Sequence, residues 1–268
     1  MTLRALPFLI VPLFAAFAGC ACAQEATAVS PTAPRAQDPF IATDDAKARK
    51  IVEDADRIRF PAEGFQVDVA IVTTAKDGDA DERKYRVLSK GNENTVVMIT
   101  EPASERGQIM LMKGRDLWVF LPNVSQPVRL SLSQRLTGQV ANGDLARTNF
   151  TGDYNAKLLR TETIEGEKYN VLELTAADRS VTYRRVVYWV RDSNSAPYKA
   201  EFYSVSNRLL KTCTYGKFET VLGKLRPTQL VMEDALHGGE RSVLDYSGMK
   251  LRDLPDKVFT KDYLKKLE

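Results

Sequence analysis

Residues 101–154 read EPASERGQIMLMKGRDLWVFLPNVSQPVRLSLSQRLTGQVANGDLARTNFTGDY. Two short apolar runs, QIMLMK and DLWVFLP, lie on either side of a turn at Gly114-Arg115, and this pattern predicts a pair of β-strands. Every residue from Leu117 to Leu121 is apolar, so both faces of the second strand are apolar. Such a strand is either buried on both sides or has one face that lines an apolar site. The sequence leaves open which face that is.

The first 23 residues are typical of an export signal, with Arg4 before an apolar run that is too short for a spanning helix. Two interpretations of its cleavage compete. An A-x-A motif that ends at Ala23 predicts a mature protein without an anchor. The residues FAGC, which end at Cys20, resemble a bacterial lipobox, whose cysteine would carry a lipid. We favour cleavage after Ala23.

The charge of the mature chain is nearly balanced. The whole sequence has 38 Lys and Arg residues against 35 Asp and Glu residues, and Arg4 leaves with the signal. The remaining basic residues are interspersed with acidic ones, so the composition argues against nucleic acid as a partner.

The chain after the signal predicts one domain. Residues 24–43 are rich in Ala, Pro and Thr without periodicity, which predicts a disordered tether. An amphipathic helix is expected from Asp44 or Asp45 to Pro61. The part from there to residue 253 shows about eleven short alternating segments joined by polar turns, which predicts an antiparallel meander within a single domain of residues 44–268. A short last helix is expected from Pro255.

Few residues are suited to catalysis. The only histidine, His237, stands beside two glycines in a predicted hairpin turn, and Cys213 is the only cysteine after the signal. One histidine and one cysteine cannot form a zinc site of the usual ligand type. Asp144 and Asp153 lie among Asn, Gly and Thr, where carboxylates commonly cap turns. We therefore expect no enzyme and no cofactor, although paired carboxylates leave a hydrolase as a minor alternative.

The ordered pattern of the central stretch resembles the LolA-like family of outer-membrane lipoprotein-sorting proteins, in its broader branch. The ending PDKVFTKDYLKKLE also resembles this family. The residues that carry the resemblance are Pro102, Gly107, Trp118, Pro122, Arg129, Gly143, Asp144, Phe150, Asp153 and Tyr154.

The resemblance implies a mainly β fold: a half-open antiparallel β-barrel with an N-terminal helix and a lid over its concave face, which receives acyl chains. It implies a periplasmic carrier that takes a lipoprotein or lipid from an inner-membrane ABC- or RND-type transporter toward the outer membrane. The candidate groove residues are Val69, Ile71, Met110, Met112, Trp118 and Phe120, with Ile51 and Val52 on the covering helix. A monomer is expected.

The long loop of residues 135–154 is the expected lid or docking element, because loops of this length in compact domains are usually functional. Its candidate residues are Arg135, Asp144, Phe150, Asp153 and Tyr154. A different class of function is also open: a β-scaffold that regulates an exporter without holding lipid. A lipidated Cys20 would favour that anchored adaptor.

Overall fold

Fifteen strands and three α-helices make up the described part of the computed structural model, residues 44–122, 124–147 and 149–264. The strands are β1 (Phe65–Thr74), β2 (Ala80–Lys90), β3 (Asn94–Glu101), β4 (Ile109–Lys113), β5 (Asp116–Phe120), β6 (Val128–Leu130), β7 (Arg135–Thr137), β8 (Val140–Ala141), β9 (Tyr154–Ile164), β10 (Glu167–Ala176), β11 (Arg185–Arg191), β12 (Pro197–Tyr203), β13 (Leu209–Val221), β14 (Lys224–Asp234) and β15 (Arg241–Leu251). The helices are α1 (Ala46–Arg59), α2 (Asn142–Ala146) and α3 (Lys261–Leu264), with 3-10 turns η1 (Ala103–Glu105) and η2 (Asp256–Phe259).

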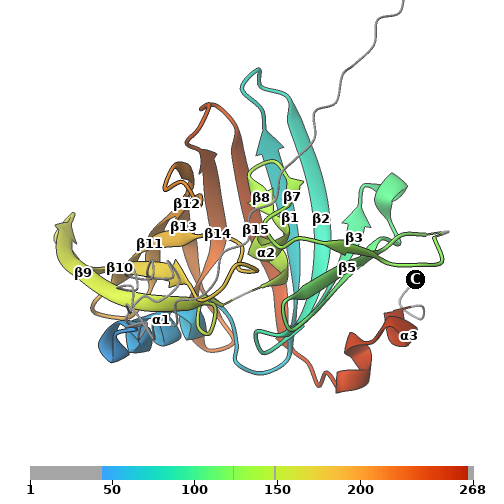
Figure 1. Cartoon of the computed structure of the whole chain (residues 1–268), viewed down its shortest axis with the longest axis horizontal. Coiled ribbons are helices and arrows are strands. Elements are labelled where there is room, and N and C mark those ends of the chain that lie inside the picture. Colours follow the sequence, from blue (N-terminus) through green and yellow to red (C-terminus); the bar gives the residue numbers. More distant parts are fainter. Residues whose placement is uncertain (1–43, 123, 148, 265–268) are drawn as a thin grey trace, which may run out of the picture. The chain divides into compact units, whose positions relative to one another are not determined.

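Thirteen of these strands form one antiparallel sheet in the order β6-β5-β4-β3-β2-β1-β15-β14-β13-β12-β11-β10-β9 (Figure 1). The chain adds strands outward from β1 to β6 and then continues at the opposite end of the sheet with β9. From β9 it returns strand by strand until β15 pairs with β1. The connection between the two end strands, residues 131–153, is called the crossover segment below.

The sheet is open, because β6 and β9 do not pair with each other. The predicted mainly β meander with sequential pairing is confirmed, while the predicted half-open barrel of about eleven strands is corrected to an open sheet of thirteen. Sequence reasoning missed β6, β7 and β8. Each has only two or three residues, which is too short for an alternating pattern to be recognised.

One face of the sheet, the inner face, carries most of the buried apolar side chains and is covered by α1 and the crossover segment. Val69 and Ile71 of β1 and Met110 and Met112 of β4 belong to this core. The other, outer face carries two smaller apolar clusters. Because successive side chains on a strand point to opposite faces, each strand contributes to both.

Helix α1 begins and ends where the sequence predicts. Asp45 is its N-cap and accepts a hydrogen bond from the backbone N–H of Lys47 at 2.9 Å. Its buried stripe packs against β9, β11, β12 and β14. At the other end Arg226 of β14 donates to the carbonyl oxygens of Arg57 and Ile58, at 2.9 Å each. These contacts satisfy carbonyls that the end of a helix leaves without an intrahelical partner.

The C-terminal residues cover the outer face of the sheet near β2 to β5. Their buried side chains, among them Val258 and Phe259, pack with Leu88, Val96 and Leu111. The single helix predicted from Pro255 is corrected to the turn η2 followed by the short helix α3, because the residue between them has extended backbone angles.

None of the helices in the described ranges is both long and apolar enough to cross a membrane. The predicted signal and tether fall on residues 1–43, which lie outside the described residues.

Candidate functional site

The crossover segment lies on the inner face and closes over its apolar core. Val140, Leu145 and Phe150 of the segment are buried in the same cluster as the strand residues beneath them. Figure 1 shows β7, β8 and α2 of this segment in front of β1 and β15. The segment therefore acts as a cover whose underside is apolar.

The backbone at the tip of the β7–β8 hairpin packs directly on side chains of β1 and β15. Gly138 has φ 48°, and a Cβ atom there would lie 2.2 Å from Oγ1 of Thr73 and 2.4 Å from Oγ of Ser242. The next residue, Gln139, donates its backbone N–H to Ser242 at 3.0 Å. Only glycine allows this close approach at a positive φ.

A buried ion pair fixes the middle of the cover. Lys211 of β13 reaches up from the sheet and contacts the carboxylate of Asp144 in α2 at 2.6 Å; the two side chains are 4% and 7% exposed. The hydroxyl of Tyr183 donates to both oxygens of the same carboxylate, at 2.9 and 2.8 Å. Burial, together with this carboxylate, raises the pKa of Tyr183 well above its ordinary value, so the hydroxyl keeps its proton.

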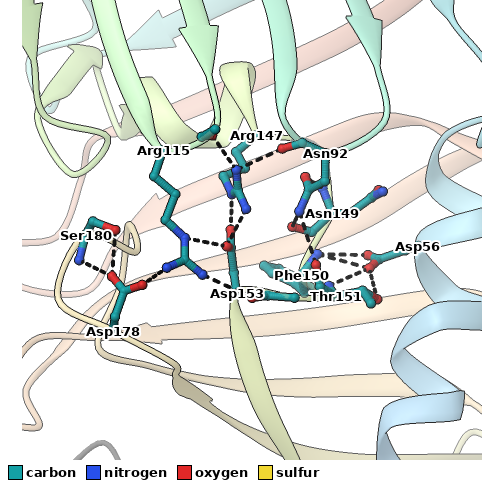
Figure 2. A network of polar contacts seen from close by, with 12 residues as sticks. Asp56, Asn92, Arg115, Arg147, Asn149, Phe150, Thr151, Asp153, Asp178 and Ser180 are labelled. Atoms are coloured by element: carbon teal, nitrogen blue, oxygen red, sulfur yellow. Dashed lines mark hydrogen bonds and ion pairs between the residues drawn. The ribbon is translucent and has the colours of Figure 1, made fainter.

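Asp56 of α1 fixes the far end of the cover, as Figure 2 shows. Its carboxylate accepts the backbone N–H of Phe150 at 3.0 Å and the backbone N–H and hydroxyl of Thr151 at 2.9 and 2.7 Å. Arg59 lies 3.4 Å from the same carboxylate, and its guanidinium carbon is 4.8 Å from the centre of the Phe150 ring. Burial raises the pKa of the Asp56 carboxyl, while Arg59 and the donors act in the opposite direction.

A second polar network joins the two ends of the sheet (Figure 2). Arg147 of the crossover segment is paired with Asp153 and donates to the carbonyl oxygens of Asn92 and Gly114 at 2.8 Å each. Arg115, in the β4–β5 turn, contacts Asp153 at 3.3 Å and is also paired with Asp178 after β10.

Within the described residues, the strands β7 and β8 of the cover form a sheet of their own, and the cover is attached to the main sheet mainly by side chains and turns. Beneath it lies a cavity of about 30 Å³, lined among others by Arg59, Tyr183, Cys213 and Tyr215. This volume holds about one or two water molecules. In this arrangement the cover itself occupies the space above the inner face.

The structure separates the predicted groove residues into two groups. Val69, Ile71, Met110, Met112, Ile51 and Val52 belong to or pack against the inner core. Phe120 packs against the C-terminal cluster of the outer face, and Lys261 of α3 lies 5.4 Å from the centre of the Trp118 ring. Leu117 and Val119 take the inner positions on β5. The expectation of one groove with all eight residues is therefore corrected, because strand alternation places Trp118 and Phe120 on the opposite face.

Four of the five predicted lid residues face into the molecule. Asp144 and Asp153 form the buried ion pairs described above, and the rings of Phe150 and Tyr154 pack edge to face at 5.6 Å. Arg135 is exposed at the start of β7. Their function as a lid stays a prediction, and the predicted long loop contains β7, β8 and α2.

Sequence reasoning missed the partners of these residues. Asp56 and Arg59 lie four residues after Val52 and Ala55, on the apolar stripe of α1. Lys211 lies two residues before the buried Cys213, on the same face of β13. A charged residue at an apolar position was therefore the available signal. It identifies a buried charge but not its partner, which lies far away in the sequence.

Cys213 is expected to react with thiol reagents only after unfolding. Its side chain is fully buried, and burial raises the pKa of the thiol to about 12. At pH 8 the thiolate fraction is then roughly a thousandfold below that of an unperturbed cysteine. The rate of labelling of the mature chain with Ellman's reagent can be compared between the folded protein and the protein denatured in about 6 M guanidinium. Equal rates in the two states would contradict the burial of Cys213.

We compared the chain with protein-family models, curated protein sequences and solved structures. A protein-family model with the description "Uncharacterized protein" matches residues 91–266. The crystal structure of a LolA superfamily protein from Nitrosomonas europaea is 70% identical over 81% of this chain and 98% of its own, with a TM-score of 0.79. No curated protein sequence matches the chain.

Two more distant structures share the fold. An outer membrane lipoprotein-sorting protein domain from Vibrio parahaemolyticus is 22% identical over 82% of this chain and 98% of its own, with a TM-score of 0.71. A DUF1329 family protein from Desulfovibrio piger is 21% identical over 83% of this chain and 100% of its own, with a TM-score of 0.72. On the strength of the 70% identical structure, the chain belongs to the LolA superfamily.

Proposed function

We propose that the protein is a periplasmic carrier that holds the acyl chains of a lipoprotein or lipid against its inner face. In this proposal it receives the cargo from an inner-membrane ABC- or RND-type transporter and moves it toward the outer membrane. The superfamily assignment and the predicted export signal support this role. The proposal requires no covalent chemistry.

One observation carries the proposal: the inner face is apolar, and its cover is attached by side chains instead of strand pairing. Moving such a cover breaks hydrogen bonds and ion pairs, but leaves the thirteen-stranded sheet intact. Moving an acyl chain of about 16 carbons from water to an apolar site is favourable by on the order of 10 kcal/mol, since each buried CH₂ contributes about 0.8 kcal/mol. A lipidated cargo in an aqueous compartment therefore needs an apolar face of this kind.

The cargo must take the place of the cover, because the cavity beneath the cover is too small for an acyl chain. The inner-face residues Val69, Ile71, Met110 and Met112 would then line the groove. Methionine suits an irregular chain because its side chain is unbranched and flexible. Trp118 and Phe120 have no part in this groove, because they lie on the outer face.

The first test is native mass spectrometry with lipid extraction on the mature protein from the periplasm of its own host. A stoichiometric acylated ligand is expected. Protein that is reproducibly empty and does not take up a fluorescent fatty-acyl probe would contradict the carrier function.

A reversible crosslink tests whether the cover moves. A Cβ atom at Gly143 would lie 3.1 Å from Cβ of Thr182, so Gly143→Cys with Thr182→Cys needs a shift of roughly half an ångström to reach disulfide geometry. In a Cys213→Ala background, the oxidised variant should lose uptake of the fatty-acyl probe and the reduced variant should regain it. Equal uptake in both states would place the cargo elsewhere.

The alternative of a non-carrier adaptor of an exporter is favoured by one observation, the filled inner face. In the described state the cavity lined by Arg59, Tyr183, Cys213 and Tyr215 has a volume of only about 30 Å³. Lipid-free protein that copurifies with an inner-membrane exporter would support this function. The same mass-spectrometric experiment therefore separates the two candidates.

A further inference from the structure

The two end strands of the sheet differ in how they are protected. Strand β6 has only three residues, and short edge strands offer few backbone groups to a passing chain. Strand β9 has eleven residues and pairs with β10 alone within the described ranges. Figure 1 shows β9 at the end of the sheet. A long unpaired edge of this kind is a template for another strand.

Part of this edge is already occupied. The backbone N–H of Asp45 donates to the carbonyl oxygen of Ala156 at 2.8 Å, and the backbone N–H of Ala156 donates to the side chain of Asp44 at 3.1 Å. Beyond this point Leu159 is 39% exposed, and Arg160 and Thr161 are exposed as well. The free part of the edge therefore begins after Ala156.

The hairpin that ends β9 shows which backbone groups point outward. Glu165 and Gly166 form a two-residue loop with φ angles of 51° and 82°, as in the type I′ turns of β-hairpins. The flanking residue Ile164 is then hydrogen-bonded to β10, and bonded and unbonded positions alternate along the strand. Thr163 and Thr161 consequently direct their backbone N–H and C=O groups to the free edge.

The sequence of this edge is complementary to itself. When two copies of the strand run antiparallel with Thr161 on the two-fold axis, Arg160 of each copy lies opposite Glu162 of the other. Leu159 then lies opposite Thr163. Arg160 and Glu162 already share one face of the strand, where they are paired at 2.6 Å. The two copies would therefore bring four alternating charges together on that face, which is a favourable cross-strand arrangement.

We propose that the protein self-associates through β9, with residues 159–163 of two copies in an antiparallel ladder about Thr161. A β-bulge marks one end of this ladder, because Leu159 has no partner in β10. The resulting homodimer has one continuous sheet across both copies. This proposal replaces the monomer expected from the sequence, and it is independent of the cargo.

The dimer is expected to be weak and salt-sensitive. Five residues from each strand fall well below the roughly 1,000 Å² of buried area that stable interfaces reach. The Arg160 side chains are 51% exposed and the Glu162 side chains 31% exposed, so salt screens their attraction. Sedimentation velocity of the mature protein across a concentration series should show a monomer–dimer equilibrium that shifts toward monomer at high salt.

Charge reversal tests the register. Arg160→Glu places two like-charged pairs across the axis and should raise the dimer dissociation constant at least about tenfold. Adding Glu162→Arg restores opposite charges in swapped positions and should recover the dimer. Lys224→Glu, an equal change of charge at an exposed residue of β14, is the matched control and should have no effect.

A crosslink provides a second readout, because Glu162 also accepts a hydrogen bond from Trp189 and its replacement can disturb β9. Thr161→Cys places two cysteines across the axis at about 5.5 Å between Cα atoms, within disulfide reach. Thr163→Cys lies on the same edge, but in this register its two copies are about 14 Å apart. We expect a disulfide-linked dimer for Thr161→Cys alone, on the full mature chain with Cys213→Ala.

Two results would overturn the proposal. One is a wild-type protein that stays monomeric at all concentrations and salt levels, with no Thr161→Cys crosslink. The other is a dimer that Arg160→Glu leaves unchanged.

Discussion

Replacing Asp56 by alanine should lower the free energy of unfolding by about 3–5 kcal/mol. The substitution removes the acceptor for two backbone N–H groups and a hydroxyl of residues 150–151. It also leaves Arg59, which is 8% exposed, as a buried charge without its carboxylate. Unpaired buried charges and unsatisfied backbone groups are among the most destabilising defects in proteins. Urea denaturation followed by circular dichroism measures the loss.

Asp54 provides the matched control on the same helix. Its carboxylate is paired with Lys50 and Arg57, but all three side chains are about a third or more exposed. Exposed pairs of this kind contribute at most about 1 kcal/mol, so Asp54→Ala should have a small effect. Equal losses for Asp54→Ala and Asp56→Ala would show that the Asp56 contacts to the cover contribute no more than a surface pair.

The second large effect is expected at the ion pair beneath the cover. Lys211→Met and Asp144→Asn should each lower the free energy of unfolding by about 3–5 kcal/mol, because each leaves the other member charged and buried. The double variant should be more stable than the sum of the two single losses predicts. Denaturant titrations of the four proteins form a double-mutant cycle that measures this coupling.

Lys217 and Asp245 form the control pair. Lys217 lies on β13 and Asp245 on β15, the two strands that flank β14, and their side chains meet at 3.2 Å with exposures of 57% and 45%. The corresponding cycle should give a coupling below about 1 kcal/mol. Additive losses at Lys211 and Asp144 would mean that the two side chains stabilise the protein independently, and the ion pair would then not be what holds the cover.

These contacts have a consequence for the proposed carrier. A cover held by buried ion pairs opens only when something replaces the lost interactions, and the burial of an acyl chain supplies a free energy of the required size. Lys211→Met with Asp144→Asn removes the polar attachment while keeping apolar contacts. If the carrier function is correct, this double variant should take up the acyl probe faster than the wild type.

Much of the fold was predictable from local patterns. The stripe of α1 and its N-cap at Asp45, the alternating strands and the two-residue turn at Glu165 are set by neighbours in the sequence. The resemblance of residues 101–154 likewise predicted the superfamily, which the 70% identical structure confirms. Patterns of this kind extend over a few residues, so they can be recognised in the sequence without knowledge of the tertiary fold.

The sequence could not decide which face of β5 is the inner one. From Leu117 to Phe120 every position is apolar, so no pattern distinguishes Leu117 and Val119 from Trp118 and Phe120. The distinction depends on what covers each face: α1 and the crossover segment on one side, η2 and α3 on the other. Those elements are far from β5 in the sequence, and only the tertiary structure brings them there.

By itself, therefore, the sequence determined the α1 helix, the antiparallel meander and the superfamily. The export signal stays a prediction. Tertiary structure alone decided that residues 131–153 cross the inner face as a cover, that Asp56 and Lys211 hold it, and that β9 pairs with β10 alone among the described strands. The physical reason is the range of the interactions. Helix stripes and strand alternation arise between near neighbours, whereas buried ion pairs and sheet edges depend on which distant segments meet.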